Sequence, residues 1–128
     1  MQMADLGVVV MTEETISTVK KIKFEWTSEG AGDNAGKATK TTAKAYSGEI
    51  IRLVTIPDGD TAPTNGYDVV VNDEDGTDVL MGAGANRSNA NTEQVLAANL
   101  GCVANDQLSL SISGAGESKK GTTILYVR

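Results

Sequence analysis

The chain has 128 residues and a mass of 13.3 kDa, with 17 acidic and 11 basic side chains, no histidine and one cysteine. This length predicts one domain, and a net charge of −6 disfavours nucleic-acid binding, which depends on neutralising phosphates with Lys and Arg. Without histidine, the usual general base and the commonest metal ligand are missing, and a lone cysteine forms no intrachain disulfide. We therefore expect a protein that is not an enzyme and that uses no cofactor.

Residues 1–14 show no clear periodicity, and we expect them to form an extended N-terminal arm ahead of a β-domain over residues 15–128. Their start is acidic, without the basic region of a secretory signal, and their apolar run is too short to span a membrane. Three consecutive valines left in water are unusual. We therefore predict that the arm docks on another chain, the alternative being a disordered start with one apolar patch. The docking residues would be Val8, Val9, Val10 and Met11.

The next segments carry strand patterns. Ile22, Phe24 and Trp26 alternate with charged residues, which is typical of a half-buried strand. Residues 28–44 are small and polar, which indicates a mobile loop or an edge excursion. Residues 49–56 are apolar at nearly every position, as in a central strand covered on both faces.

The second half of the chain continues in the same way. Residues 67–72 and 77–81 are expected to form a hairpin closed by an Asp-Gly turn, and residues 91–94 resemble a helix N-cap leading into a short helix. Two further strands are predicted, one from the alternation of Leu108, Leu110 and Ile112 and one over residues 122–128. The predicted fold is all-β: an antiparallel β-sandwich or barrel of about six to eight strands, with one short helix and the N-terminal arm.

Two loops could carry chemistry. The acidic turn Asp73–Asp78 has the oxygen ligands of a calcium site, but Val71 and Gly82 fall where the terminal ligands should be, so we expect a solvated turn, with weak Ca²⁺ binding as the alternative. Residues 82–87 resemble a phosphate-binding loop, except that Arg87 replaces the third glycine. We expect a plain flexible connection, or a loop in which Arg87 reaches a carboxylate on a neighbouring surface.

Three other side chains have simpler interpretations. Trp26 and Tyr67 fall on the inward phases of their strands and are expected in the core. Cys102 has no charged neighbour in sequence and is predicted to be a small buried side chain rather than a reactive thiolate.

Several segments together resemble small structural proteins of tailed bacteriophages, over about residues 23–128. They are Lys23–Ser28, Ala45–Pro57, Tyr67–Val69, Asp73–Leu80, Gly84–Arg87 and Thr92–Leu96. The resemblance implies a virion component without catalytic residues, made in the host bacterial cytoplasm. We favour a capsid decoration protein on the capsid exterior, which binds the lattice of major capsid protein and bridges its subunits, with a homotrimer as the expected oligomer.

Two alternatives remain open at this point. A head–tail connector or tail protein would use a similar β-domain in a ring. A carbohydrate- or receptor-binding β-module is disfavoured because only 4% of the residues are aromatic and most of these are inward by phase. Neither a membrane nor a nucleic acid is an expected partner.

Overall fold

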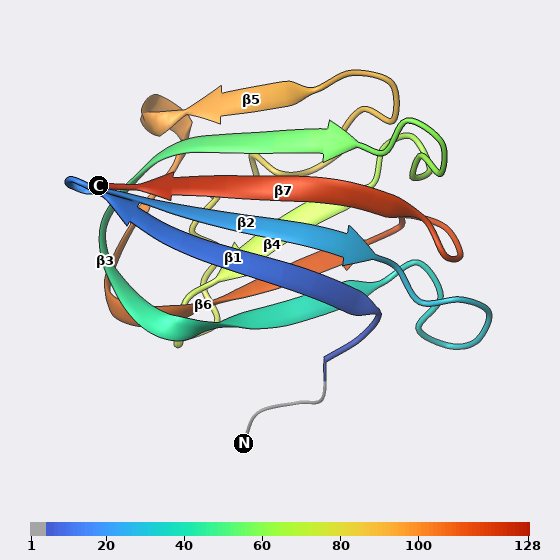
Figure 1. Cartoon of the computed structure of the whole chain (residues 1–128), viewed down its shortest axis with the longest axis horizontal. Coiled ribbons are helices and arrows are strands. Elements are labelled where there is room, and N and C mark those ends of the chain that lie inside the picture. The colour runs from blue at the N-terminus through green and yellow to red at the C-terminus, as the bar shows by residue number, and fades with distance from the viewer. Residues whose placement is uncertain (1–4) are drawn as a thin grey trace.

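The computed structural model describes residues 5–128, which form seven strands and one 3-10 turn (Figure 1). All strand pairs are antiparallel. The elements are β1 (Val8–Ile16), β2 (Val19–Thr27), β3 (Ala38–Pro57), β4 (Asp68–Asn72), β5 (Glu93–Leu96), η1 (Ala97–Asn99), β6 (Cys102–Ser113) and β7 (Lys120–Val127).

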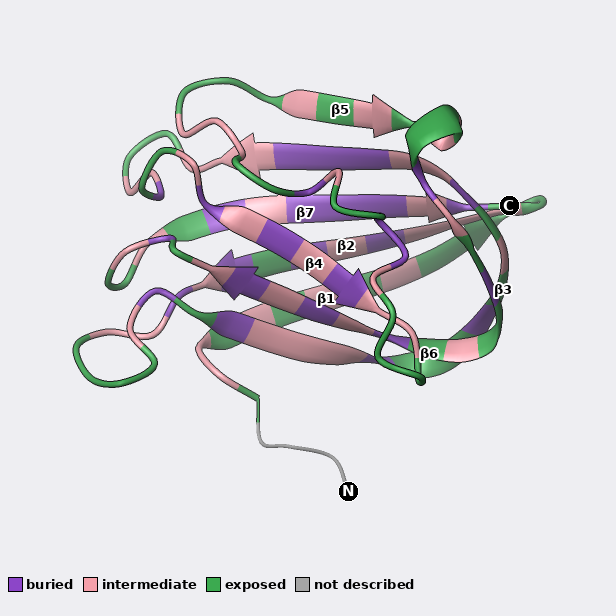
Figure 2. Ribbon diagram, turned by 180° about the vertical axis from the view of Figure 1, so that it is seen from behind, coloured by how far each residue is buried: buried purple, intermediate pink, exposed green. Residues whose placement is uncertain are grey.

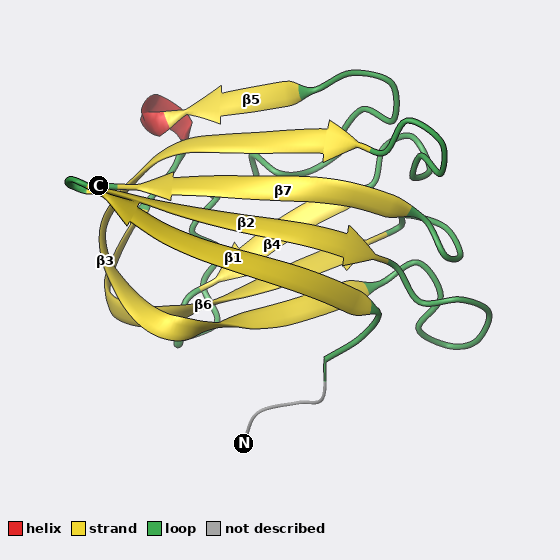
Figure 3. Cartoon of the chain, viewed as in Figure 1, coloured by secondary structure: helices red, strands yellow, loops and turns green. Residues whose placement is uncertain are grey.

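The strands follow the order β1-β2-β7-β3-β6-β4, with β5 also paired to β3. Strand β3 is 20 residues long and belongs to two layers, because its first half pairs with β6 and its second half with β7 and β5 (Figure 3). The bend lies at Gly48, where φ is +134° and an added Cβ would be 2.5 Å from the carbonyl oxygen of Arg128. Only glycine fits this position without a shift of the C-terminal strand. The result is a β-sandwich, which confirms the predicted all-β class.

The core lies between the two layers (Figure 2). Ile22, Phe24 and Trp26 of β2 are buried as their alternation predicted, and they belong to the same core cluster as the buried residues of β6. Trp26 and Tyr67 are both core residues, with ring centroids 5.6 Å apart. The predicted strands around residues 22–26, 49–56, 108–112 and 122–128 are all present.

The expectation of a separate N-terminal arm is wrong for the described residues of that segment, which belong to the β-domain. Residues 8–16 form β1, which pairs with β2 through a two-residue turn at Ser17 and Thr18, where Ser17 has φ of 57°. Thr39 also donates its backbone N–H to the carbonyl of Leu6 (2.9 Å), so the chain before β1 is held against β3. The domain therefore includes residues that we assigned to an arm, and residues 1–4 of that arm lie outside the described part of the chain. We placed the domain boundary after residue 14 because the consecutive valines at the start of β1 do not alternate with polar residues.

Three other segments also differ from expectation. The stretch over residues 28–44 is only partly a loop, since β3 begins at Ala38. The predicted second hairpin strand over residues 77–81 consists of turns with one isolated bridge, because the Asp78 carboxylate accepts hydrogen bonds from the backbone N–H groups of Leu80 and Gly82. The predicted helix after residue 94 is reduced to η1, since Val95 pairs with Leu53 in the sheet.

Among residues 5–128, no helix is long and apolar enough to cross a membrane.

Candidate functional site

The layer formed by β1, β2, β7, the second half of β3 and β5 has one side packed on the core and one side turned to solvent. We call the second side the outer face. Strand register and the period-two alternation of side chains define its members. They are Val8, Val10, Thr12, Glu14 and Ile16 of β1, Lys21, Lys23, Glu25 and Thr27 of β2, Lys120, Thr122, Ile124 and Tyr126 of β7, Arg52, Val54 and Ile56 of β3, and Gln94 and Leu96 of β5.

The outer face exposes large apolar side chains. Val8, Val10, Ile16 and Leu96 are 64%, 60%, 62% and 60% exposed. Val54 and Ile124, in the middle of the face, are instead covered by their neighbours. The exposed apolar residues lie on the edge strands β1 and β5, and the charged residues of β2 and β3 lie between them. Exposed apolar side chains gathered on one face are typical of a protein-binding site.

One end of the outer face contains a shallow hollow of about 320 Å³. Its walls include Val8, Val10 and Lys120, and Trp26 and Gly121 also line it.

Asp58 adds a negative charge to the wall of this hollow. Its carboxylate accepts hydrogen bonds from the backbone N–H groups of Thr61 (2.8 Å) and Asp60 (3.1 Å). These bonds lower the pKa of Asp58, so it is ionised at neutral pH. The hollow therefore combines the apolar side chains of Val8 and Val10 with the charged residues Glu25, Asp58 and Lys120.

The predicted docking residues divide between the two sides of β1. Val8 and Val10 lie on the outer face, whereas Val9 and Met11 are partly buried against the core. The apolar run that we interpreted as an arm is therefore a strand with both sides apolar. Two of its four predicted residues remain available to a partner.

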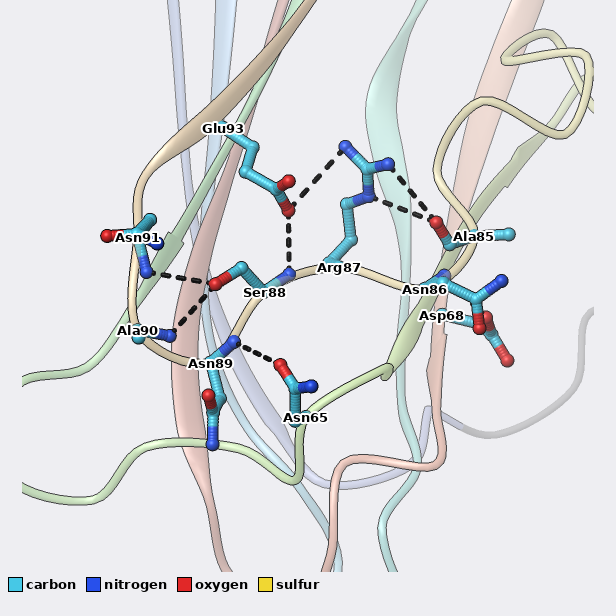
Figure 4. Close-up of polar contacts among 10 residues, drawn as sticks. All are labelled: Asn65, Asp68, Ala85, Asn86, Arg87, Ser88, Asn89, Ala90, Asn91 and Glu93. Carbon is cyan, nitrogen blue, oxygen red and sulfur yellow. Dashed lines mark hydrogen bonds and ion pairs between the residues drawn. The ribbon is translucent and has the colours of Figure 1, made fainter.

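Arg87 is engaged within its own chain (Figure 4). Its Nε and Nη2 donate to the carbonyl oxygen of Ala85 at 3.2 and 3.1 Å, and its Nη1 lies 3.9 Å from Oε1 of Glu93. Glu93 also accepts a hydrogen bond from the backbone N–H of Ser88 (2.6 Å), and the Arg87 side chain is only 15% exposed. The carboxylate that the guanidinium meets belongs to β5, so Arg87 does not have the partner on a neighbouring surface that we considered, and its loop is not a plain flexible connection.

The acidic turn uses its carboxylates to hold backbone N–H groups. Asp73 Oδ1 accepts from Asp75 and Thr77, and Asp78 Oδ1 accepts from Val71. Nowhere in the described part of the chain do three His, Cys, Asp or Glu side chains come together as a metal site would require. Residues 74–77 of this turn are exposed to solvent. Cys102, predicted to be buried, is exposed at the start of β6.

Sequence reasoning missed a cluster at the other end of the outer face, where Lys21, Arg52 and Tyr126 meet. These residues belong to three strands that are distant in the sequence. The last strand gave one local signal of this cluster, because it has apolar residues on both sides. Leu125 points into the core, so its neighbour Tyr126 points to the outer face.

Comparisons with known proteins do not place the chain in a family. No protein-family model and no curated protein matches the chain. One solved structure, from a study of the promiscuous specificity of carbohydrate-binding modules of the β-sandwich superfamily, is similar at 15% sequence identity and a TM-score of 0.32. The match covers 96% of this chain and 52% of the other, so this chain spans about half of that protein. At this level of likeness the comparison assigns neither a ligand nor a role.

Proposed function

We propose that this protein is a structural component of a tailed-phage virion, and that it acts as a capsid decoration protein. In this role it binds the lattice of major capsid protein on the outside of the assembled head and bridges neighbouring subunits. A trimer around a local symmetry axis would present three copies of the same face to the lattice. The observation that carries the proposal is the outer face, on which four large apolar side chains are at least 60% exposed.

The shape of this surface supports adhesion more than chemistry. The outer face is a broad sheet surface and not a deep cleft, and the hollow beside Val8 is shallow. Exposed apolar area of this kind is stabilised when a second surface removes it from water, at about 25 cal/mol per Å². The sandwich beneath it is held by buried residues from both layers, so the face is rigid before it meets a partner.

The test is binding of the full-length protein to emptied, expanded heads that lack it, measured by co-sedimentation. Val8→Asp and Val10→Asp place charges on the outer face without touching the core, and each should weaken binding at least about tenfold, or roughly 1.4 kcal/mol. Met81→Asp is the matched control, because Met81 is 68% exposed but lies on the segment between β4 and β5. It should bind as the wild type does.

Copy number separates the alternatives. Quantitative gel analysis of virions should give hundreds of copies per particle for a decoration protein, and about a dozen for a connector or tail ring. If the protein does not bind emptied heads but does bind an immobilised polysaccharide, the proposal is contradicted and a carbohydrate-binding module is favoured.

A further inference from the structure

Two cations share one aromatic ring on the outer face. The Tyr126 ring has the Arg52 guanidinium carbon 5.2 Å and the Lys21 ammonium 6.0 Å from its centroid. The three residues form a single cross-strand row, because Tyr126 is paired with Lys21 on one side and with Arg52 on the other. Both cations are within the range at which a ring face attracts positive charge.

Arg52 is held in one orientation by two contacts. Its Nε donates a hydrogen bond to Oε1 of Gln94 at 2.9 Å, and its planar group lies over the Tyr126 ring. The terminal amino groups, Nη1 and Nη2, have no hydrogen-bond or ion-pair partner among residues 5–128, and neither does the ammonium of Lys21. The donors that remain free on Arg52 are the two that bind a carboxylate in a bidentate manner.

Three other cations form ion pairs within residues 5–128. Lys23 lies 3.4 Å from Glu25, Lys40 lies 3.6 Å from Asp5, and Arg87 contacts Glu93. Glu14 is opposite Lys21 in register, yet these two form no ion pair within the described residues. Lys21 and Arg52 are thus two cations at the same ring, and neither has an ion-pair partner among the described residues.

We infer that Arg52, Lys21 and Tyr126 form a receptor for an acidic side chain of the protein that the outer face binds. This inference rests on the proposed function, in which that protein is the capsid subunit. The carboxylate would accept two hydrogen bonds from Nη1 and Nη2 of Arg52 and the charge of Lys21, while Leu96, paired with Arg52 and 60% exposed, covers the apolar part of the same partner segment.

The charge of the whole chain explains why the ligand is a carboxylate on a protein and not a nucleic acid. A net charge of −6 repels a polyanion, whose binding requires many neutralised phosphates. A local positive site on a chain of net negative charge instead fixes the register of two protein surfaces. Together with the hollow beside Val8, it would set how the face sits on the lattice.

The first arm of the test is binding to emptied heads at low and high salt. Arg52→Glu and Lys21→Glu should each weaken binding about tenfold at low salt and should reduce its salt dependence. Arg52→Lys keeps the charge but loses the planar fork, so it should give an intermediate loss of about threefold. Lys44→Glu, an exposed residue in the part of β3 that pairs with β6, changes the net charge equally and should bind as the wild type does.

The second arm needs no capsid. The ¹⁵N-labelled full-length protein is titrated with a capped tetraglutamate peptide, and the Arg52 Nε–H signal is followed. We expect a saturable shift that Lys21→Glu abolishes and that a capped tetralysine peptide does not produce. The inference would be overturned if tetraglutamate caused no shift, whether or not inorganic phosphate caused one.

The two arms separate the two claims. Heads that bind the wild type and the Arg52→Glu variant equally would overturn the carboxylate receptor and leave the decoration role standing. Heads that bind neither would overturn the decoration role, and the peptide titration would then decide the receptor by itself.

Discussion

Replacing Gly121 with alanine tests how the sheet beneath the hollow is packed. A Cβ at this position would lie 2.5 Å from Cζ2, 2.9 Å from Cε2 and 3.2 Å from Cη2 of Trp26. The indole has little room to move, because it is 1% exposed and packs against Tyr67. Overpacking of a core costs about 1–3 kcal/mol, and three contacts this short place Gly121→Ala near the upper end, at about 3 kcal/mol.

The assay is urea unfolding followed by tryptophan fluorescence, with thermal unfolding as a second measurement. At about 4 °C for each kcal/mol, Gly121→Ala should lower the Tm by about 12 °C. Gly59→Ala is the control, since an added Cβ there meets nothing within 4 Å, and it should change stability by less than about 0.5 kcal/mol. In a Trp26→Phe background, the added cost of Gly121→Ala should fall below about 1 kcal/mol. An equal loss in both backgrounds would refute the steric explanation.

Three further predictions concern single groups. Thr123→Val should raise the free energy of unfolding by up to about 1 kcal/mol, because the Thr123 hydroxyl is buried without a hydrogen-bond partner among the described residues; a lower Tm would contradict this. Burial raises the pKa of Tyr46 and of Tyr67, and a hydrogen bond to Glu13 raises that of Tyr46 further. Their neutral forms therefore stabilise the fold fully below about pH 10, and stability should decline as the pH rises beyond that value. Urea midpoints measured across this range check the decline, which should be smaller in Tyr46→Phe. The exposed thiol of Cys102 should react with a disulfide reagent in the native protein at a rate that urea does not increase.

Strict alternation made much of the fold predictable. Leu108, Leu110 and Ile112 are buried and alternate with polar residues, so both the strand and its buried side follow from the sequence. Strand β1 lacks this contrast, since Val8 and Val10 occupy the solvent side where polar residues are usual. The departure that hid the strand is the same feature on which the proposed binding surface rests.

Other features depended on side-chain contacts that local patterns do not encode. The segment after β4 has the composition of a hairpin strand, but the Asp78 carboxylate binds nearby N–H groups and folds it into turns. Arg87 was a candidate for a partner contact because the sequence does not show that Glu93 lies beside it in the fold. Lys21, Arg52 and Tyr126 are neighbours only because of the register of three strands, which the sequence does not specify locally.

Hydroxyl-radical footprinting of the protein, free and bound to emptied heads, measures directly which surface makes contact. Val8, Val10, Leu96 and Tyr126 should lose most of their labelling on binding, because they lie on the outer face. Met81, exposed outside that face, should label equally in both states. Unchanged labelling of the outer face in the bound protein, with protection at Met81 instead, would contradict the central claim that this sheet surface is where the protein adheres.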